Sequence, residues 1–243
     1  MLQIPIIFIL FLTSISVFSQ EPALSIGLGT AARSQIYKAG ENELRALPFI
    51  SWKSKNFYFR GITLGYQIYS KYPVVNLTLN PTTIEVDNAE GTYNEAMRKR
   101  YRTLHGGIET VLPLSWANLV FHLQTDLLGI HQGWTLAMEI KRRFQLTSDW
   151  NLSPGLVIQH LSENYVEYYF GVNADEVRAD RPLYRPKSEI QYGPILSSLY
   201  NFSENWSLIN NFRYIKFGSE IARSPLLKRN DQFSILIGVS RSI

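Results

Sequence analysis

The sequence predicts an all-β fold, a transmembrane antiparallel β-barrel of about 10 strands, with 12 as the alternative. Residues alternate in character at every second position along many segments, which is the period of a strand with two different faces. Four of the five Trp lie beside short polar turns, where membrane barrels place aromatic girdles. Aromatic residues make up 13% of the 243 residues, a high share for a soluble domain.

The clearest hairpin surrounds the polar turn at residues 203–206, between alternating segments at 190–202 and 206–217. Similar turns with a neighbouring Trp occur at residues 52–56, 113–116 and 147–150. A soluble all-β domain could also close its hairpins with Trp, so the turns alone do not separate the two classes.

The segment at residues 134–144 does separate them. Its outward positions are apolar, including Leu136 and Met138, whereas Glu139, Lys141 and Arg143 occupy the other face. A soluble sandwich could not bury that charged face, because unmatched buried charges cost several kcal/mol. The segment therefore favours a barrel with a polar lumen.

Eleven segments qualify as strands, and bacterial single-chain barrels have an even number. Residues 74–86 are interrupted by Pro81, so placing them in an outer loop leaves ten strands. The four Trp-bearing turns then face the periplasm, and long loops such as 162–187 and 218–230 lie outside. Within the expected strand at 57–68, Arg60 shares the apolar side near a turn, where a lipid-facing cation costs only about 0–1 kcal/mol.

The final segment, residues 233–243, alternates to the end of the chain. We expect Ile237 to face lipid and Gly238 to face the lumen. Ile237→Arg should then cost about 2–4 kcal/mol, and Gly238→Ser much less.

Residues 1–19 form an apolar run followed by small residues, which predicts a signal peptide, and residues 20–243 are expected to form one barrel domain. Cysteine is absent, which excludes disulfides and thiolate metal sites. The net charge is only +4, and the longest basic run is residues 98–100. Nucleic acid is therefore not an expected partner.

Candidate sites are few. His122, Asp126, Glu139, Lys141 and Arg143 are expected to form a network of paired polar groups inside the barrel. In the long segment 162–187, an aromatic group could bind a partner or simply pack the loop onto the rim, and packing is favoured two to one; it comprises Tyr168, Tyr169 and Phe170.

No catalytic, cofactor or metal site is expected. The four His show no ligand spacing with Asp or Glu. His122 and Asp126 are about 13 Å apart along an extended strand, so they cannot bond each other directly.

Several segments resemble the MltA-interacting protein family, also called the MipA/OmpV family. The specific ones are Tyr-Tyr-Phe-Gly-Val at residues 168–172, the Arg/Pro-rich residues 181–184, and residues 217–226, which are similar to that family's last outer loop. Shorter matches lie at residues 59–61, 65–66, 126–129 and 131–133. Many barrel proteins end on Phe or Tyr, whereas this chain ends on Ile243.

The resemblance implies a β-barrel in the lipid of the cell outer membrane. In some members it implies a scaffold that joins a lytic transglycosylase to a murein synthase, and in others a link to osmotic adaptation or adhesion. It brings no catalytic residues. A scaffold with a filled lumen is the first hypothesis, a small-solute diffusion channel or osmotic-adaptation porin the second, and a barrel hydrolase the third.

Overall fold

The computed structural model describes residues 24–40, 43–86 and 92–243. The predicted signal peptide at residues 1–19 lies outside these ranges. Among the described residues, no helix is long and apolar enough to cross a membrane.

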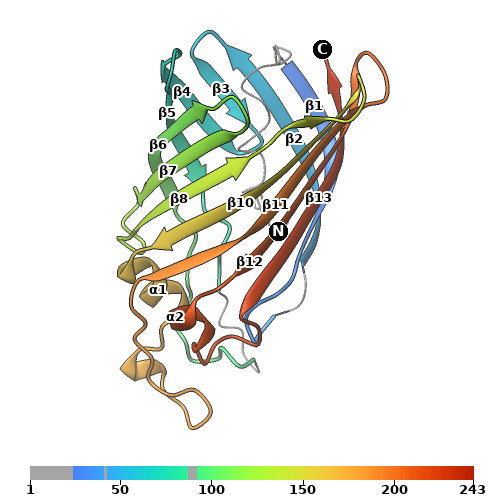
Figure 1. Ribbon diagram of the computed structural model, residues 1–243. Helices are drawn as coiled ribbons and strands as arrows, with labels where there is room; N and C mark the ends of the chain where they lie inside the picture. The colour runs from blue at the N-terminus through green and yellow to red at the C-terminus, as the bar shows by residue number, and fades with distance from the viewer. Residues whose placement is uncertain (1–23, 41–42, 87–91) are drawn as a thin grey trace, which may run out of the picture.

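The described chain forms one closed antiparallel β-barrel (Figure 1). Its strands are β1 (Leu24–Arg33), β2 (Glu43–Ser54), β3 (Phe57–Arg60), β4 (Thr63–Tyr69), β5 (Val74–Pro81), β6 (Leu104–Pro113), β7 (Asn118–Asp126), β8 (Trp134–Lys141), β9 (Phe144–Gln145), β10 (Trp150–Leu161), β11 (Glu189–Asn201), β12 (Trp206–Lys216) and β13 (Asp231–Ser242). Each strand pairs with the next in sequence, apart from β8 and β9, and the pairing of β13 with β1 closes the barrel.

The barrel wall has twelve strand positions, because β8 and β9 both pair with β10 and continue along one line. The alternative of twelve strands is therefore confirmed, in place of the preferred ten. The segment expected in an outer loop is β5, which pairs with β6 from Val74 to Pro81. Pro81 is the last residue of this strand, so its missing N–H leaves the rest of the hydrogen-bond ladder intact.

The expected strand at 57–68 is a short hairpin, β3 and β4, that turns at Gly61. Gly61 has φ +61°, a conformation that costs glycine least. The turn reverses the chain, so Tyr58 and Arg60 point into the barrel, with the Arg60 guanidinium 4.7 Å from the Tyr58 ring centroid. The prediction that Arg60 faces lipid was wrong. Between described residues, β2 pairs with β3 only over Ser51–Ser54.

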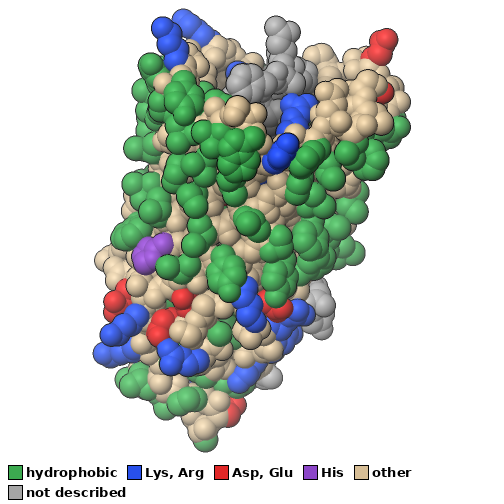
Figure 2. All heavy atoms as spheres, in the orientation of Figure 1, with side chains coloured by type: hydrophobic (Ala, Val, Ile, Leu, Met, Phe, Trp, Pro, Cys, Tyr) green, Lys and Arg blue, Asp and Glu red, His purple; other side chains and the backbone are tan. Residues whose placement is uncertain are grey.

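An apolar band covers the outside of the barrel, with charged side chains above and below it on the face that Figure 2 shows. Leu28, Leu136, Leu156 and Ile237 are among its exposed residues. Four exposed Trp stand at the end that carries the short turns and the C-terminus, which we call the short-turn end; they are Trp52, Trp116, Trp150 and Trp206. The band and the girdle are the surfaces that a lipid bilayer requires.

The opposite end, which we call the loop end, is covered by the chain itself (Figure 1). Helix α1 (Glu163–Phe170), the 3₁₀ helix η1 (Ala174–Glu176) and the connection to β11 form a lid, defined as residues 162–188. A shorter helix, α2 (Ser219–Ala222), lies beside it. Buried side chains of α1, such as Val166 and Tyr169, share one apolar core with Val157, Ile195 and other lumen residues. The lid therefore packs onto the inner wall of the barrel.

A second group of buried apolar side chains fills the lumen. This lumen apolar cluster comprises Ala31, Leu47, Phe49, Ile209 and Leu236. The Phe49 ring has room because its neighbours are glycines: a Cβ at Gly27 would lie 2.3 Å from the ring, and one at Gly238 would lie 2.7 Å from it. The small inner face predicted for β1 thus makes space for an aromatic side chain from β2.

Candidate functional site in the barrel interior

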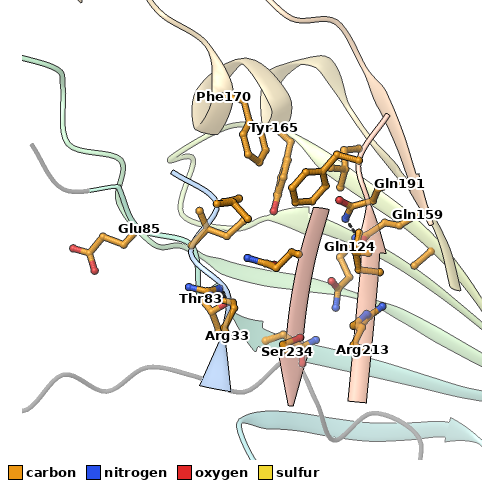
Figure 3. A pocket seen from close by; sticks show the side chains of 18 of the residues that line it. Arg33, Thr83, Glu85, Gln124, Gln159, Tyr165, Phe170, Gln191, Arg213 and Ser234 are labelled. Atoms are coloured by element: carbon orange, nitrogen blue, oxygen red, sulfur yellow. Dashed lines mark hydrogen bonds between the residues drawn. The ribbon is translucent and has the colours of Figure 1, made fainter. Parts of the chain in front are cut away.

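A cavity of about 170 Å³ lies inside the barrel, beneath the lid. Figure 3 shows Tyr165 and Phe170 of α1 reaching toward it from above, with Arg33 and Arg213 on the opposite side. On the inner faces of β1 and β13, Arg33 and Ser234 line the cavity, and two residues further along each strand come Ala31 and Leu236 of the lumen apolar cluster. The cavity is therefore held between the lid and that cluster.

Glu139 is the centre of an ion-pair network on the cavity wall. It is 3% exposed, and its carboxylate lies 2.8 Å from the Lys141 Nζ and 3.3 Å from the Arg213 Nη2. The predicted pairing of Glu139 with Lys141 is present in the structure. Arg213 comes from β12 on another part of the wall, and the local pattern of β8 gave no sign of it.

His122 joins a neighbouring polar group. Its Nδ1 lies 3.6 Å from Glu109 Oε2, across the β6–β7 pair. Glu109 also accepts hydrogen bonds from Asn76 Nδ2 at 2.7 Å and from the Tyr58 hydroxyl at 3.5 Å. Glu109 was missed from the sequence, although its position directly opposite His122 could have been found by pairing the two strands.

Two predicted members of the network lie elsewhere. Asp126 ends β7 at the loop end, where it accepts hydrogen bonds from the backbone N–H groups of His131 at 2.6 Å and Gln132 at 2.9 Å. Arg143 falls between β8 and β9, is exposed, and donates to Asn151 Oδ1 at 2.9 Å. Asp126 therefore shapes a loop, and Arg143 lies outside the ion-pair network of Glu139.

The aromatic group of the outer segment is packed. Tyr169 is 0% exposed and Phe170 is 3% exposed. Tyr168 is half-buried, and its hydroxyl accepts a hydrogen bond from the Tyr101 N–H at 2.8 Å. The arrangement agrees with the packing alternative, because a partner could reach only Tyr168 without unfolding α1.

A buried ion pair fixes the lid to the loop before β6. Arg100 Nη2 lies 2.8 Å from Glu176 Oε2, with both side chains buried. Burial opposes ionisation of Glu176, but hydrogen bonds from Arg100 and from the backbone N–H groups of Asn173 and Arg98 outweigh it and lower its pKa to about 2. The depressed pKa means that this anchor stabilises the lid above the ordinary Glu pKa of about 4.3. That stabilisation is lost as pH falls through about 2.

Glu176→Gln should raise the rate at which trypsin cuts the lid, because it leaves the Arg100 charge buried without a partner. Breaking a buried pair in this way costs about 3–5 kcal/mol. The matched control is Asp175→Asn, which breaks the exposed Arg98–Asp175 pair and should cost about 0–1 kcal/mol. Equal digestion rates for the two variants would show that the anchor does not hold the lid.

Within residues 24–40, 43–86 and 92–243, no group of three or more His, Asp or Glu side chains is placed to hold a metal ion. Two buried imidazoles do meet at the loop end, with His105 Nε2 and His131 Nε2 2.8 Å apart. His131 Nδ1 accepts a hydrogen bond from the Gly133 N–H at 2.9 Å, so its other nitrogen carries the proton and donates it to His105. The pair is a hydrogen bond between neutral rings.

The sequence matches known outer-membrane proteins along nearly its whole length. A family model described as MltA-interacting protein MipA matches residues 26–243. The outer membrane protein YiaT of Escherichia coli O157:H7 is 27% identical over 222 residues, 89% of each chain. The MltA-interacting protein of Escherichia coli K12 is 25% identical, over 96% of this chain and 95% of that one. Outer membrane protein OmpV of Vibrio cholerae is 22% identical, over 90% of this chain and 86% of its own. These names are those of outer-membrane or interacting proteins and not of enzymes.

Proposed function

Because the chain belongs to the MltA-interacting protein (MipA) family of outer-membrane β-barrels, we propose that it acts as a scaffold. In this role it holds other proteins of the cell envelope at its surfaces and passes no solute through its lumen. The name of the Escherichia coli relative, MltA-interacting protein, supports a partner of that class. We extend the proposal to a lytic transglycosylase and a murein synthase, the partners that the family resemblance implies.

The filled lumen is the observation that carries the proposal. The lid packs onto the inner wall at the loop end, and the lumen apolar cluster occupies the space below the cavity. A twelve-strand barrel is only moderately wider than the eight-strand barrels that side chains fill, and much narrower than the 16–18-strand porins. The charges of Glu139, Lys141 and Arg213 are paired with one another, which favours a plug over a conducting path.

The short turns are the surfaces best suited to partners in the periplasm, the compartment that they are expected to face. They join strands whose register is fixed, so their side chains are held in place at the rim. One of them carries the exposed Trp116 between β6 and β7, an aromatic residue of the kind enriched at protein interfaces.

Site-specific crosslinking tests the scaffold. A photoreactive residue at Trp116 or Glu204, both in short turns, should capture a lytic transglycosylase or a murein synthase in intact cells. The matched control carries the same residue at Leu183, which is exposed in the lid and should capture neither. Failure of both short-turn positions to capture either enzyme would contradict the proposed partners.

Planar-bilayer recording separates the scaffold from the diffusion channel. The purified protein should show no steady conductance, since the lumen is filled. Steady steps that change on Lys141→Ala, but not on the control Arg143→Ala, would overturn the scaffold in favour of the channel. The control is apt because Arg143 lies outside the ion-pair network.

A further inference from the structure

We propose that the cavity beneath the lid binds one acidic monosaccharide, a sugar ring with several hydroxyl groups and a carboxylate. This binding site is additional to the scaffold role. Three features of the cavity lining point to such a ligand: a set of glutamine amides, an excess of positive charge and an aromatic roof.

Glutamines from four strands line the cavity. They are Gln124 on β7, Gln159 on β10, Gln191 on β11 and Gln232 on β13. Gln191 Nε2 donates to Gln159 Oε1 at 2.9 Å, and Figure 3 shows these two amides beside Gln124 at one side of the cavity. Each amide has two N–H donors and a carbonyl acceptor, so one bond leaves much of their capacity facing the cavity. A sugar hydroxyl both donates and accepts, and it can use either end of an amide.

The charges of the lining favour an anion. Its two carboxylates are each shared by two cations: Glu139 by Lys141 and Arg213, and Glu85 by Lys99 and Arg102. Figure 3 shows the Glu85 carboxylate pointing away from the rest of the lining.

With both carboxylates matched in this way, the guanidinium groups of Arg33 and Arg213 give the cavity a positive surplus. Arginine presents its N–H donors in a planar fork that fits a carboxylate with two parallel bonds. A carboxylate on the ligand would therefore find a complementary partner on this side of the cavity.

The roof completes the match. Tyr165 and Phe170 of α1, with Tyr37 and Phe217, line the upper side, and all four are buried. A sugar ring presents an apolar C–H face between its hydroxyl edges, and an aromatic surface is where that face can be removed from water. The volume of about 170 Å³ suits one sugar ring and is too small for an oligosaccharide.

Calorimetric titration of the full detergent-solubilised protein tests the proposal. Glucuronate is the probe, with glucose and inorganic phosphate as comparisons. Glucuronate should bind at least tenfold more tightly than glucose, which lacks the carboxylate. It should also bind at least tenfold more tightly than phosphate, which lacks the hydroxylated ring.

Arg213→Gln and Gln191→Leu should each weaken glucuronate binding at least tenfold. The matched control is Arg229→Gln, which removes an exposed guanidinium paired with Asp231 and should leave binding unchanged. If the Arg213 variant fails to assemble, as judged by its mobility on unboiled gels, Arg33→Gln takes its place.

Three outcomes would overturn the proposal: no heat of binding with glucuronate, equal affinity for phosphate, or equal affinity for glucose. Equal affinity for phosphate would identify a site for simple anions. None of these results bears on the scaffold, whose crosslinks at the short turns are measured independently.

Discussion

Glu139→Gln is expected to destabilise the barrel by about 3–5 kcal/mol. Glu139 is 3% exposed, and its carboxylate neutralises both Lys141 and Arg213. Glutamine keeps the shape of the side chain but removes the charge, so two cations remain close together in a narrow lumen without a counter-ion. Urea unfolding of the protein in lipid vesicles, followed by mobility on unboiled gels, measures the change.

Two variants control this result. Glu204→Gln removes an exposed carboxylate in the turn between β11 and β12 and should change the stability by less than about 0.5 kcal/mol. Adding Lys141→Met to Glu139→Gln should recover part of the loss, because one of the unmatched charges is then gone. Equal midpoints for Glu139→Gln and the unmodified protein would mean that water, and not Glu139, compensates the cations.

Ile237→Arg is expected to cost about 2–4 kcal/mol, because it places a charge on the lipid-facing surface far from either end of β13. Ile237 is 46% exposed within the apolar band. Ile237→Leu is the control, since it keeps an apolar side chain toward lipid and should assemble normally. Equal folding yields of the two variants in vesicles would contradict the assigned face.

The companion substitution Gly238→Ser has a larger expected cost than the sequence suggested. A Cβ at this position would lie 2.7 Å from Cε1 of Phe49 and 3.2 Å from the Gly29 Cα. Phe49 would have to move within the lumen apolar cluster, and overpacking of this kind costs about 1–3 kcal/mol. The inner face of β13 is therefore tightly packed, and the contrast with Ile237→Arg is smaller than alternation alone implies.

The fold was predictable where it depends on local pattern. Alternation placed Leu136 and Met138 outside and Glu139 and Lys141 inside, because the period of two is a property of every strand. The turn at Gly61 escaped prediction, since the residues on both sides of it continue an alternating pattern that fits one longer strand equally well. Strand pairing across the barrel, which decides between these readings, is not encoded locally.

The same limit applies to the interior site. Arg213 reaches Glu139 from a strand more than 70 positions away in sequence, a separation of 74 residues, and no periodicity links the two. Asp126 was placed on the correct face of β7, but the loop that follows folds back and takes up its carboxylate. Arg143 was assigned from a pattern that stops at Lys141, where β8 ends.

The short pairing between β2 and β3 has a mechanical consequence. Strands held side by side separate one hydrogen bond after another when they are pulled apart, so the resistance of a wall is set by its shortest run of pairs. Between described residues that run is Ser51–Ser54 on β2, whereas β1 and β13, which bring the two ends of the barrel together, are paired from Ser25 to Arg33. Under sideways load the barrel would tear beside β2, and the junction of its first and last strands would outlast it.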